Sequence, residues 1–477
     1  MFKMFYKFVL IQGLLLLFGF SSSAVNVRNF GATGDGVTDD TEAIINALKS
    51  VDDGVLMFPA GTYKISRTIE IQLADTRPIS VTGNGGSAVV VMHASGPAIR
   101  FAGTHENGSA LPATLSESVW NRERMPLIEA IEIRGAHPQA NGIEFRHTFQ
   151  PTIRGVLIRK VHHGLHFTSR NRNVLVESSH IYHCSGIGIF LDEVNIHQMN
   201  IGNSHISYCR EGGIKVTKSE IRNFQITGND IEYNCDPQAG PVADIWIDVK
   251  DGGSVREGTI TGNTIQAIQS PGGANIRFTG LKGNPDKIGL WSITGNHISN
   301  QEINIDLQSS RGISITGNTF IRAYDRHLVM NDSKNILVST NVFDHNPDYF
   351  TQDVVAAGGI MIQRSEQILL SQNILEGMAY GTAEQGGAVV VSKSSAVDIL
   401  DLQINNPKYR GIEIEGCSEV TVSRCRIRAG DSESFVAGIA LKSNNIRYQV
   451  RNNIITGGGQ GITGISKKEL KYNTIER

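Results

Sequence analysis

The chain has 477 residues, and its 44 lysines and arginines nearly balance its 46 aspartates and glutamates, so the formal charge is −2. This balance provides no strong positive field, which argues against a nucleic-acid partner. Apolar residues make up 40% of the chain, and 51 glycines accompany only 13 prolines, which excludes disordered and collagen-like chains and indicates a folded protein with many turns.

Residues 1–24 have the pattern of a secretory signal. Lys3 and Lys7 precede an apolar run over residues 8–20, and small residues follow over 21–24. The run of about 13 residues is too short for a membrane span, which needs roughly 20. We therefore predict cleavage after Ala24, a secreted or periplasmic protein, and no membrane span after signal removal.

Residues 25–70 are predicted to form an N-terminal cap made of a strand, a helix and a first coil. Asp39, with Glu42 three residues later, is a helix-start pattern, and Ala43, Ile44 and Leu48 would form the apolar face of that helix.

The segments VNVRNFGATGDGVTDDTEAIINAL over 25–48 and GVLMFPAGTYKIS over 54–66 resemble the opening of the pectate-lyase-like superfamily, which includes rhamnogalacturonase and epimerase-like proteins and phage tailspikes. The resemblance implies a right-handed β-helix whose open apolar end is covered by the cap helix. The catalytic motif set of the polygalacturonase branch is absent, so its chemistry is not carried over.

Residues 71–477 contain a repeat marked by asparagine. The string Ile-Thr-Gly-Asn begins at Ile226, Ile260, Ile293 and Ile315, and a looser pattern extends it in both directions. The fourth position of the repeat falls on Ile131, Val156, Ser179, Ser204, Asn229, Asn263, Asn296, Asn318, Asn341, Asn373, Leu402, Cys425, Asn453 and Asn473. A buried amide can pair with the amides above and below it, so we predict an asparagine ladder at a turn.

Each repeat also contains a short strand with alternating apolar residues, such as Gly-Ile-Glu-Phe from Gly142 and Gly-Ile-Glu-Ile from Gly411. Repeats of 20 to 34 residues that contain such strands predict an all-β fold, a single-stranded parallel β-helix solenoid. A leucine-rich repeat has similar coil lengths, but its regular leucine consensus is missing. Cys184, Cys209 and Cys235 follow the repeat, and we expect a row of stacked thiols there rather than disulfides.

The residue between the two inward positions of each strand should point outward, and stacking should align these residues in a row. The predicted row is Glu144, His166, Gly188, Lys215, Trp246, Arg277, Asp306, Val329, Met361, Val390, Glu413 and Ala440. Long insertions before Asp244, after Asp248 and after Arg277 frame the centre of the row. Such loops predict a groove with a charged and aromatic floor, which suits an extended sugar chain.

The residues at the centre of this groove are our candidates for catalysis and substrate binding. The candidate catalytic residues are Asp244, Asp248, Asp306 and Arg277. The candidate substrate-binding residues are Trp246, Lys215, Asn275, Asn304 and His327. The alternative is that Trp246, Arg277 and Asp306 form a cation–π and ion-pair ladder without a functional role.

These features favour an exported carbohydrate-active enzyme that takes a polysaccharide or oligosaccharide, with glycoside hydrolysis ahead of lyase or uronate C5-epimerase chemistry. A hydrolase needs two carboxyl groups, and Asp306 lies roughly 11 to 12 Å from Asp244 or Asp248 by strand spacing, farther apart than inverting enzymes require. Lys215, Arg277 or His166 would serve a lyase. From another class, a non-catalytic glycan-binding surface protein stays open. No cofactor is predicted, and no metal site either, because stacked repeats explain His180 and His205.

Overall fold

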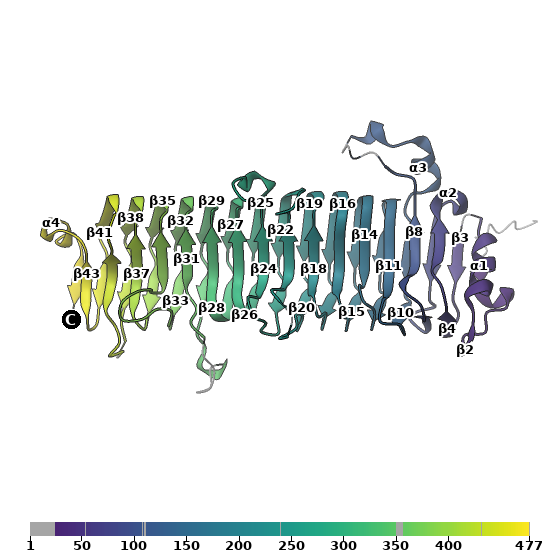
Figure 1. The fold of residues 1–477 in the computed structure, drawn as a ribbon, viewed down its shortest axis with the longest axis horizontal. Coiled ribbons are helices and arrows are strands. Elements are labelled where there is room, and N and C mark those ends of the chain that lie inside the picture. The colour runs from purple at the N-terminus through teal and green to yellow at the C-terminus, as the bar shows by residue number, and fades with distance from the viewer. Residues whose placement is uncertain are drawn as a thin grey trace, which may run out of the picture.

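The structure, a computed structural model, describes residues 24–476 apart from 53, 107, 109, 110, 239, 350–355 and 431. Residues 1–23 of the predicted signal lie outside the described residues. The described chain forms a long rod in which strands stack from the N-terminal to the C-terminal end (Figure 1). All named strands pair in parallel within one continuous set of 44 strands, which confirms the predicted parallel β-helix.

The strands form three long sheets, because each coil contributes one strand to each side of the rod. Sheet A consists of β5 (Ile69–Gln72), β8 (Gly96–Ala102), β11 (Ala140–Phe149), β14 (Leu165–Glu177), β16 (Ile187–Gly202), β18 (Gly212–Thr217), β21 (Ala243–Asp248), β24 (Ala274–Thr279), β26 (His297–Gln308), β28 (Thr319–Asn331), β31 (Ile360–Gln363), β34 (Val389–Ser392), β37 (Arg410–Glu415), β40 (Ala437–Leu441) and β43 (Gln460–Thr463).

Sheet B follows sheet A along the chain in most coils. It consists of β1 (Val25–Asn26), β3 (Gly54–Met57), β6 (Ile79–Thr82), β9 (Leu127–Glu129), β12 (Thr152–Arg154), parts of β14 and β16, β19 (Glu220–Thr227), β22 (Ser254–Thr261), β25 (Ile288–Thr294), β27 (Arg311–Thr316), β29 (Lys334–Ser339), β32 (Glu366–Ser371), β35 (Ser395–Leu400), β38 (Ser418–Ser423) and β41 (Ile446–Arg451).

Sheet C completes each coil. It consists of β2 (Asp35–Asp39), β4 (Gly61–Ile65), β7 (Ala88–Met92), β10 (Glu132–Gly135), β13 (Leu157–Arg159), β15 (His180–Tyr182), β17 (His205–Ser207), β20 (Asp230–Glu232), β23 (Thr264–Gln266), parts of β26 and β28, β30 (Val342–Phe343), β33 (Ile374–Glu376), β36 (Gln403–Asn405), β39 (Arg426–Arg428), β42 (Ile454–Thr456) and β44 (Thr474–Glu476).

Helices occur only at the ends and in turns of the described chain. They are η1 (Val27–Phe30), α1 (Thr41–Lys49), α2 (Leu73–Thr76), η2 (Pro112–Thr114), α3 (Glu117–Arg122), η3 (Pro285–Lys287), η4 (Pro347–Tyr349) and α4 (Lys467–Leu470). The cap helix α1 lies at the N-terminal end of the rod (Figure 1). Its Ile44 and Leu48 join the apolar core, as predicted, and Ala43 packs against that core from a half-buried position. The prediction that Asp39 caps the helix is wrong by one residue, because Asp40 is the N-cap, although Asp39 still accepts a hydrogen bond from the Thr41 N–H.

The interior of the rod is filled by columns of apolar side chains that the stacking aligns. Phe101, Phe145 and Phe167 come from successive coils, and their rings stack with centroids 5.2 and 5.1 Å apart. Aliphatic columns continue this core along the described chain. Cys184, Cys209 and Cys235 are buried free thiols, which confirms the expectation of thiols rather than disulfides.

The asparagine ladder forms at the turn between sheets B and C. In Asn263 the backbone N–H and Nδ2 both donate to Oδ1 of Asn296, at 3.0 and 2.9 Å, while Nδ2 also donates to the Ile226 carbonyl. The same bonds link each asparagine to the next from Asn229 to Asn373. Leu402 interrupts the ladder, which resumes at Asn453. The ladder confirms the prediction and satisfies the polar groups of a buried turn.

Replacing Asn263 with leucine tests the contribution of the ladder to stability. Asn263→Leu would leave two donors of Asn229 without their acceptor and the buried Ile226 carbonyl without its donor. We expect the free energy of unfolding to fall by about 1 to 3 kcal/mol, measured by denaturant unfolding. Gln449→Leu on the exposed surface is the matched control and should change stability by less than about 0.5 kcal/mol. Equal midpoints for the two variants would contradict a stabilising ladder.

Candidate functional site

The outward row on sheet A is present, with one change in register. Pairing aligns His166 with Phe190 and Phe190 with Lys215, after which Trp246, Arg277 and Asp306 follow in order. The prediction of Gly188 at this place is wrong. Inward and outward side chains alternate over the five residues from Ile187, so a register shift of two residues keeps each side chain on the same face. Only the pairing between coils determines that Phe190 rather than Gly188 lies in the row.

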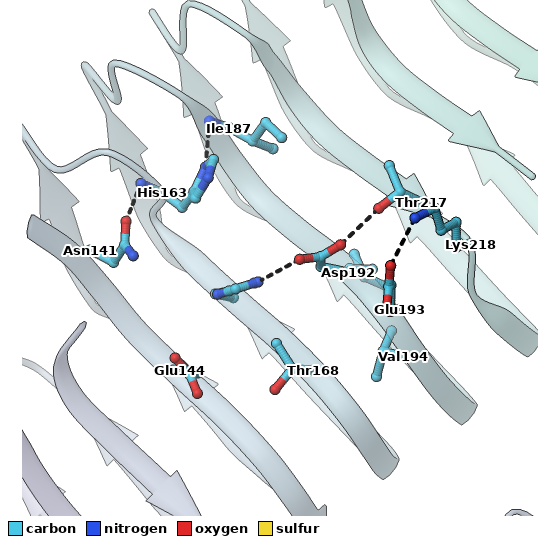
Figure 2. Close-up of polar contacts among 12 residues, drawn as sticks. Asn141, Glu144, His163, Thr168, Ile187, Asp192, Glu193, Val194, Thr217 and Lys218 are labelled. Atoms are coloured by element: carbon cyan, nitrogen blue, oxygen red, sulfur yellow. Dashed lines mark hydrogen bonds and ion pairs between the residues drawn. The ribbon is translucent and has the colours of Figure 1, made fainter. Parts of the chain in front are cut away.

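Aromatic rings and a carboxylate cluster at the N-terminal half of the row. The rings of His166 and Phe190 stack with centroids 5.2 Å apart, and the ring of His163 lies 5.0 Å from Phe190. Nδ1 of His163 accepts a hydrogen bond from the Ile187 N–H, and Thr217 donates to Asp192 at 3.0 Å (Figure 2). His163 is therefore held as a neutral ring, since burial lowers its pKa to about 3.

Asp192 is the accessible carboxylate of this cluster. Its Oδ2 lies 3.5 Å from Nε2 of His166, and its side chain is 37% exposed. The interaction with His166, together with the Thr217 hydroxyl, lowers the pKa of Asp192 below its usual range. Asp192 is thus held in its ionised form and faces solvent.

Trp246 lies between two cations. The Lys215 ammonium lies 4.6 Å from the ring centroid, and the Arg277 guanidinium carbon lies 5.4 Å from it. Nε1 of Trp246 donates to the Thr279 hydroxyl at 3.0 Å. Burial lowers the pKa of Lys215 below its usual value. The contact of Arg277 with the Trp246 ring is the cation–π part of the ladder without a functional role, which was the alternative interpretation to a sugar-binding role for Trp246.

Arg277 and Asp306 form the covered end of the ladder. Nε of Arg277 lies 2.9 Å from Oδ2 of Asp306, and Arg277 also donates to the Gly272 carbonyl. Gln308 donates to the other oxygen of Asp306, so neighbouring side chains occupy both oxygens. The two residues are only 7% and 6% exposed. The expectation that they line an open groove is wrong, because the turn at Gly272 folds over them.

Asp244, Asn275, Asn304 and His327 lie inside the protein rather than on the outer face, so that expectation is also wrong. Each is at most 3% exposed. They form a second polar ladder, in which Asn275 donates to Asp244, Asn304 donates to Asn275, and Nδ1 of His327 lies 2.7 Å from Oδ1 of Asn304. Asn234 donates to the other oxygen of Asp244. These residues begin the sheet A strands at the corner with sheet C, where the inserted turns cover side chains that would otherwise point to solvent.

Asp248 is aligned with Asp192 on the outer side of sheet A, but it is only 8% exposed. Thr217 pairs with Asp192 on one side and with Asp248 on the other. The two aspartates therefore occupy the same register position two strands apart, with α-carbons about 9.6 Å from each other by strand spacing. Oδ2 of Asp248 lies 3.2 Å from the half-exposed Lys250 ammonium. Sequence analysis missed Asp192 because the shifted register hid its alignment with Asp248.

No group of three or more His, Cys, Asp or Glu side chains within the described part of the chain is arranged to hold a metal ion. His180 and His205 stack edge to face with centroids 5.0 Å apart, and Tyr182 hydrogen-bonds to Nδ1 of His205. A search of the helices in the described ranges finds none with the length and apolar character of a membrane span.

Two family profiles match the chain. The profile described as rhamnogalacturonase A/epimerase, pectate lyase-like, matches residues 24–105. The profile described as right handed beta helix region matches residues 79–280, 245–400 and 284–477, which together cover most of the chain. The two matches agree with the cap and the coils that the structure shows.

Similarity to individual proteins is local in sequence and global only in fold. A glucan 1,3-beta-glucosidase of Cochliobolus carbonum is 45% identical over 53 residues, 11% of this chain and 7% of that protein. Mannuronan C5-epimerase AlgE1 of Azotobacter vinelandii is 50% identical over 44 residues, 9% of this chain and 3% of that protein. The chain thus spans less than a tenth of these relatives. The pre-mature bacteriophage phi29 gene product 12 superimposes with a TM-score of 0.51 at 15% identity, covering 93% of this chain and 56% of that one, which shows the fold alone.

The buried carboxyl of Asp244 should make stability depend on pH. Burial raises the pKa of Asp244 from 3.8 to about 7. Below pH 4 both folded and unfolded chains hold the proton, and between about pH 4 and 7 only the unfolded chain releases it, so the stability contribution falls as pH rises. Asp244→Asn removes this titration, and its stability relative to wild type should rise by about 1.4 kcal/mol per pH unit in that window, measured by denaturant unfolding.

The control is Asp398→Asn, which removes an exposed carboxyl from sheet B and leaves Asp244 in place, so this variant should keep the pH dependence assigned to Asp244. Parallel pH profiles for wild type and Asp244→Asn would show that Asp244 is ionised in the folded protein throughout this window.

Proposed function

The chain belongs to the right-handed β-helix proteins of the pectate-lyase-like superfamily, and we propose that it is an exported carbohydrate-active enzyme whose substrate lies along the open half of sheet A. The proposed floor runs from His166 through Phe190 and Lys215 to Trp246. The sequence similarity to a glucosidase and to epimerases, which covers about a tenth of the chain, supports the same substrate class. Glycoside hydrolysis is our preferred chemistry.

The observation that carries this proposal is the alignment of Asp192 and Asp248. Inverting glycosidases use two carboxyl groups roughly 6.5 to 9.5 Å apart, one as acid and one as base, with room between them for water and the scissile bond. The α-carbons of this pair are about 9.6 Å apart, and rotation of the side chains toward each other brings the carboxyl groups within that range. Thr217 lies between them and pairs with both.

The surroundings of the two carboxyl groups suit different roles. Asp192 is ionised because His166 and Thr217 lower its pKa, so we assign it the role of base toward the attacking water. Asp248 is nearly buried, at 8% exposure, and its cation is the half-exposed Lys250. With Asp192 as the base, Asp248 is the second carboxyl of the pair, and we assign it the role of acid toward the leaving oxygen.

The other residues predicted from sequence receive supporting roles in this proposal. Arg277 and Asp306 fix the position of the Trp246 ring through the ion pair and the cation–π contact. The corner ladder of Asp244, Asn275, Asn304 and His327 holds the starts of the strands that carry Trp246 and Arg277. Lys215 and the edge of Trp246 remain available to contact substrate.

Lyase or C5-epimerase chemistry is the second candidate, and Lys215 is the observation that favours it. Such enzymes remove a proton next to a uronate carboxylate, which requires a base and a neighbouring cation. Burial lowers the pKa of Lys215 and thereby increases its fraction of neutral amine, while Lys250 supplies a positive charge on the same face. An uronate-containing substrate would be required.

Incubation with a panel of neutral and uronate polysaccharides tests these alternatives. A hydrolase releases reducing ends without absorbance at 235 nm, a lyase raises both signals, and an epimerase changes only the proton NMR spectrum of the polymer. We expect reducing ends alone, with the first product in the inverted anomeric form by NMR. A retained anomer would contradict the assigned pair, and none of these signals with any polysaccharide would favour a non-catalytic binding protein.

Substitution of each carboxylate identifies the acid and the base. Asp192→Asn and Asp248→Asn should each lower kcat by about 10²- to 10⁴-fold with an unchanged unfolding midpoint. Asp398→Asn, on the exposed face of sheet B, is the matched control and should keep full activity. Full activity in both site variants would place the catalytic pair elsewhere. Loss of activity in Lys215→Met with Asp192→Asn still active would instead support the lyase mechanism.

A further inference from the structure

Sheet B bends at one position in every coil near the N-terminal half of the rod. At that position Gln150, Asn173, Gln198 and Asn223 come from successive coils and have left-handed backbone conformations, with φ of 58°, 56°, 67° and 57°. Pairing of the flanking residues places these four side chains in register. They form a row of four amides, which we call the amide row.

The backbone does not require amides at this position. The aligned position in the eight later coils has the same left-handed conformation, with φ between 50° and 66°. Its residues are Glu257, Leu290, Gly312, Asn335, Gln367, Ala396, Glu419 and Arg447. Acidic, apolar, small and basic residues are therefore all accommodated by the same bend. Amides occupy all four positions of the amide row but only two of the eight later ones, Asn335 and Gln367, so the turn geometry alone does not account for the row.

The amide row lines a surface cavity of about 430 Å³. Asn200 and Gln225, from the adjoining position of sheet B, add two further amides to its wall. Met125, at the end of the insertion that carries α3, and Leu175 supply its apolar surface and are 61% and 40% exposed. This insertion projects from the rod next to β8 (Figure 1).

The lining of the cavity is polar without charge. None of the described residues that line it has a titratable side chain. Each amide offers both a donor and an acceptor, which matches the hydroxyl group of a sugar, also a donor and an acceptor. Nδ2 of Asn173 donates to Oε1 of Gln198 at 2.6 Å, and this bond orients both amides before any ligand arrives.

We propose that this cavity is a second, non-catalytic binding site for an uncharged oligosaccharide. The amides hydrogen-bond to its hydroxyl groups, and Met125 and Leu175 contact the apolar C–H face of a sugar ring. No lining residue is a cation, and the adjoining Arg172 is held by its Nε, which donates to Oδ1 of Asn173 at 3.2 Å. The lining itself therefore offers a uronate, sulfate or phosphate no compensating charge. Successive amides repeat about every 4.8 Å along the stack, so an extended sugar chain that lies along the rod would meet one in each coil.

The site lies on sheet B, whereas the proposed catalytic face lies on sheet A, so one molecule could hold a polysaccharide at two places. Binding at the amide row does not depend on hydrolysis. It would keep the enzyme on its substrate between catalytic events and raise the effective concentration of nearby chains at sheet A.

Isothermal titration calorimetry of the whole protein with cellohexaose, mannohexaose, laminarihexaose and hexagalacturonate tests the site. We expect at least one neutral hexasaccharide to bind and hexagalacturonate not to compete for the same site. Gln198→Ala should weaken that binding at least tenfold. Gln367→Ala is the matched control, because it removes the same side chain from the same backbone conformation outside the cavity, and it should leave affinity unchanged.

Trp246→Ala separates this site from the catalytic face. If the neutral sugar binds at the amide row, Trp246→Ala retains its affinity while Gln198→Ala loses it. No binding by any of the three neutral hexasaccharides, equal weakening by Gln198→Ala and Gln367→Ala, or loss of binding in Trp246→Ala alone would each overturn the proposal. Chemical shift changes confined to the Asn and Gln side-chain amides of the cavity would locate the sugar directly.

Discussion

Parallel stacking in register is the constraint on which the rest of this structure depends. Backbone hydrogen bonds fix successive coils about 4.8 Å apart, so each side chain meets the side chain at the same position of the coil above and below. A favourable neighbour contact is therefore repeated along the rod, as in the asparagine ladder, the phenylalanine columns and the row from His166 to Asp306. An unfavourable one would be repeated as well. Buried positions consequently hold residues, such as asparagine and phenylalanine, whose side chains interact favourably with an identical side chain in the next coil.

The same constraint determines what chemistry a β-helix face can perform. Neighbouring in-register side chains are too close for two carboxyl groups to share a substrate and a water molecule, whereas positions two coils apart have the required spacing. Asp192 and Asp248 have that relation, with Thr217 between them. Burial and neighbouring charges then make such equivalent positions differ. His166 favours the ionised form of Asp192, while the turns around Asp248 restrict its access to solvent.

Turns and insertions decide which parts of the repeating surface stay open. The turn at Gly272 covers Arg277, and the corner between sheets C and A buries Asp244 and Asn275 although strand alternation directs them outward. The polar residues enclosed in this way satisfy one another, and they hold strand ends in place rather than meeting a ligand. Where the connections between strands are short, as beside the amide row on sheet B, the row stays at the surface. The functional difference between the sheets thus comes from their connections.

The sequence alone determined the features that repeat: the parallel β-helix, the cap helix, the asparagine ladder, the free thiols and the order Lys215, Trp246, Arg277, Asp306 along one row. These follow from local alternation and from a period that recurs many times in the chain. The tertiary structure decided the features that occur once. The segment from Ile187 fits two registers with the same faces, so only pairing between coils aligned Phe190 with Lys215 and Asp192 with Asp248. The exposure of Asp244, Arg277 and Asp306 depended on turns whose path leaves no periodic signal, because a turn folds according to its contacts with other coils rather than by its own pattern.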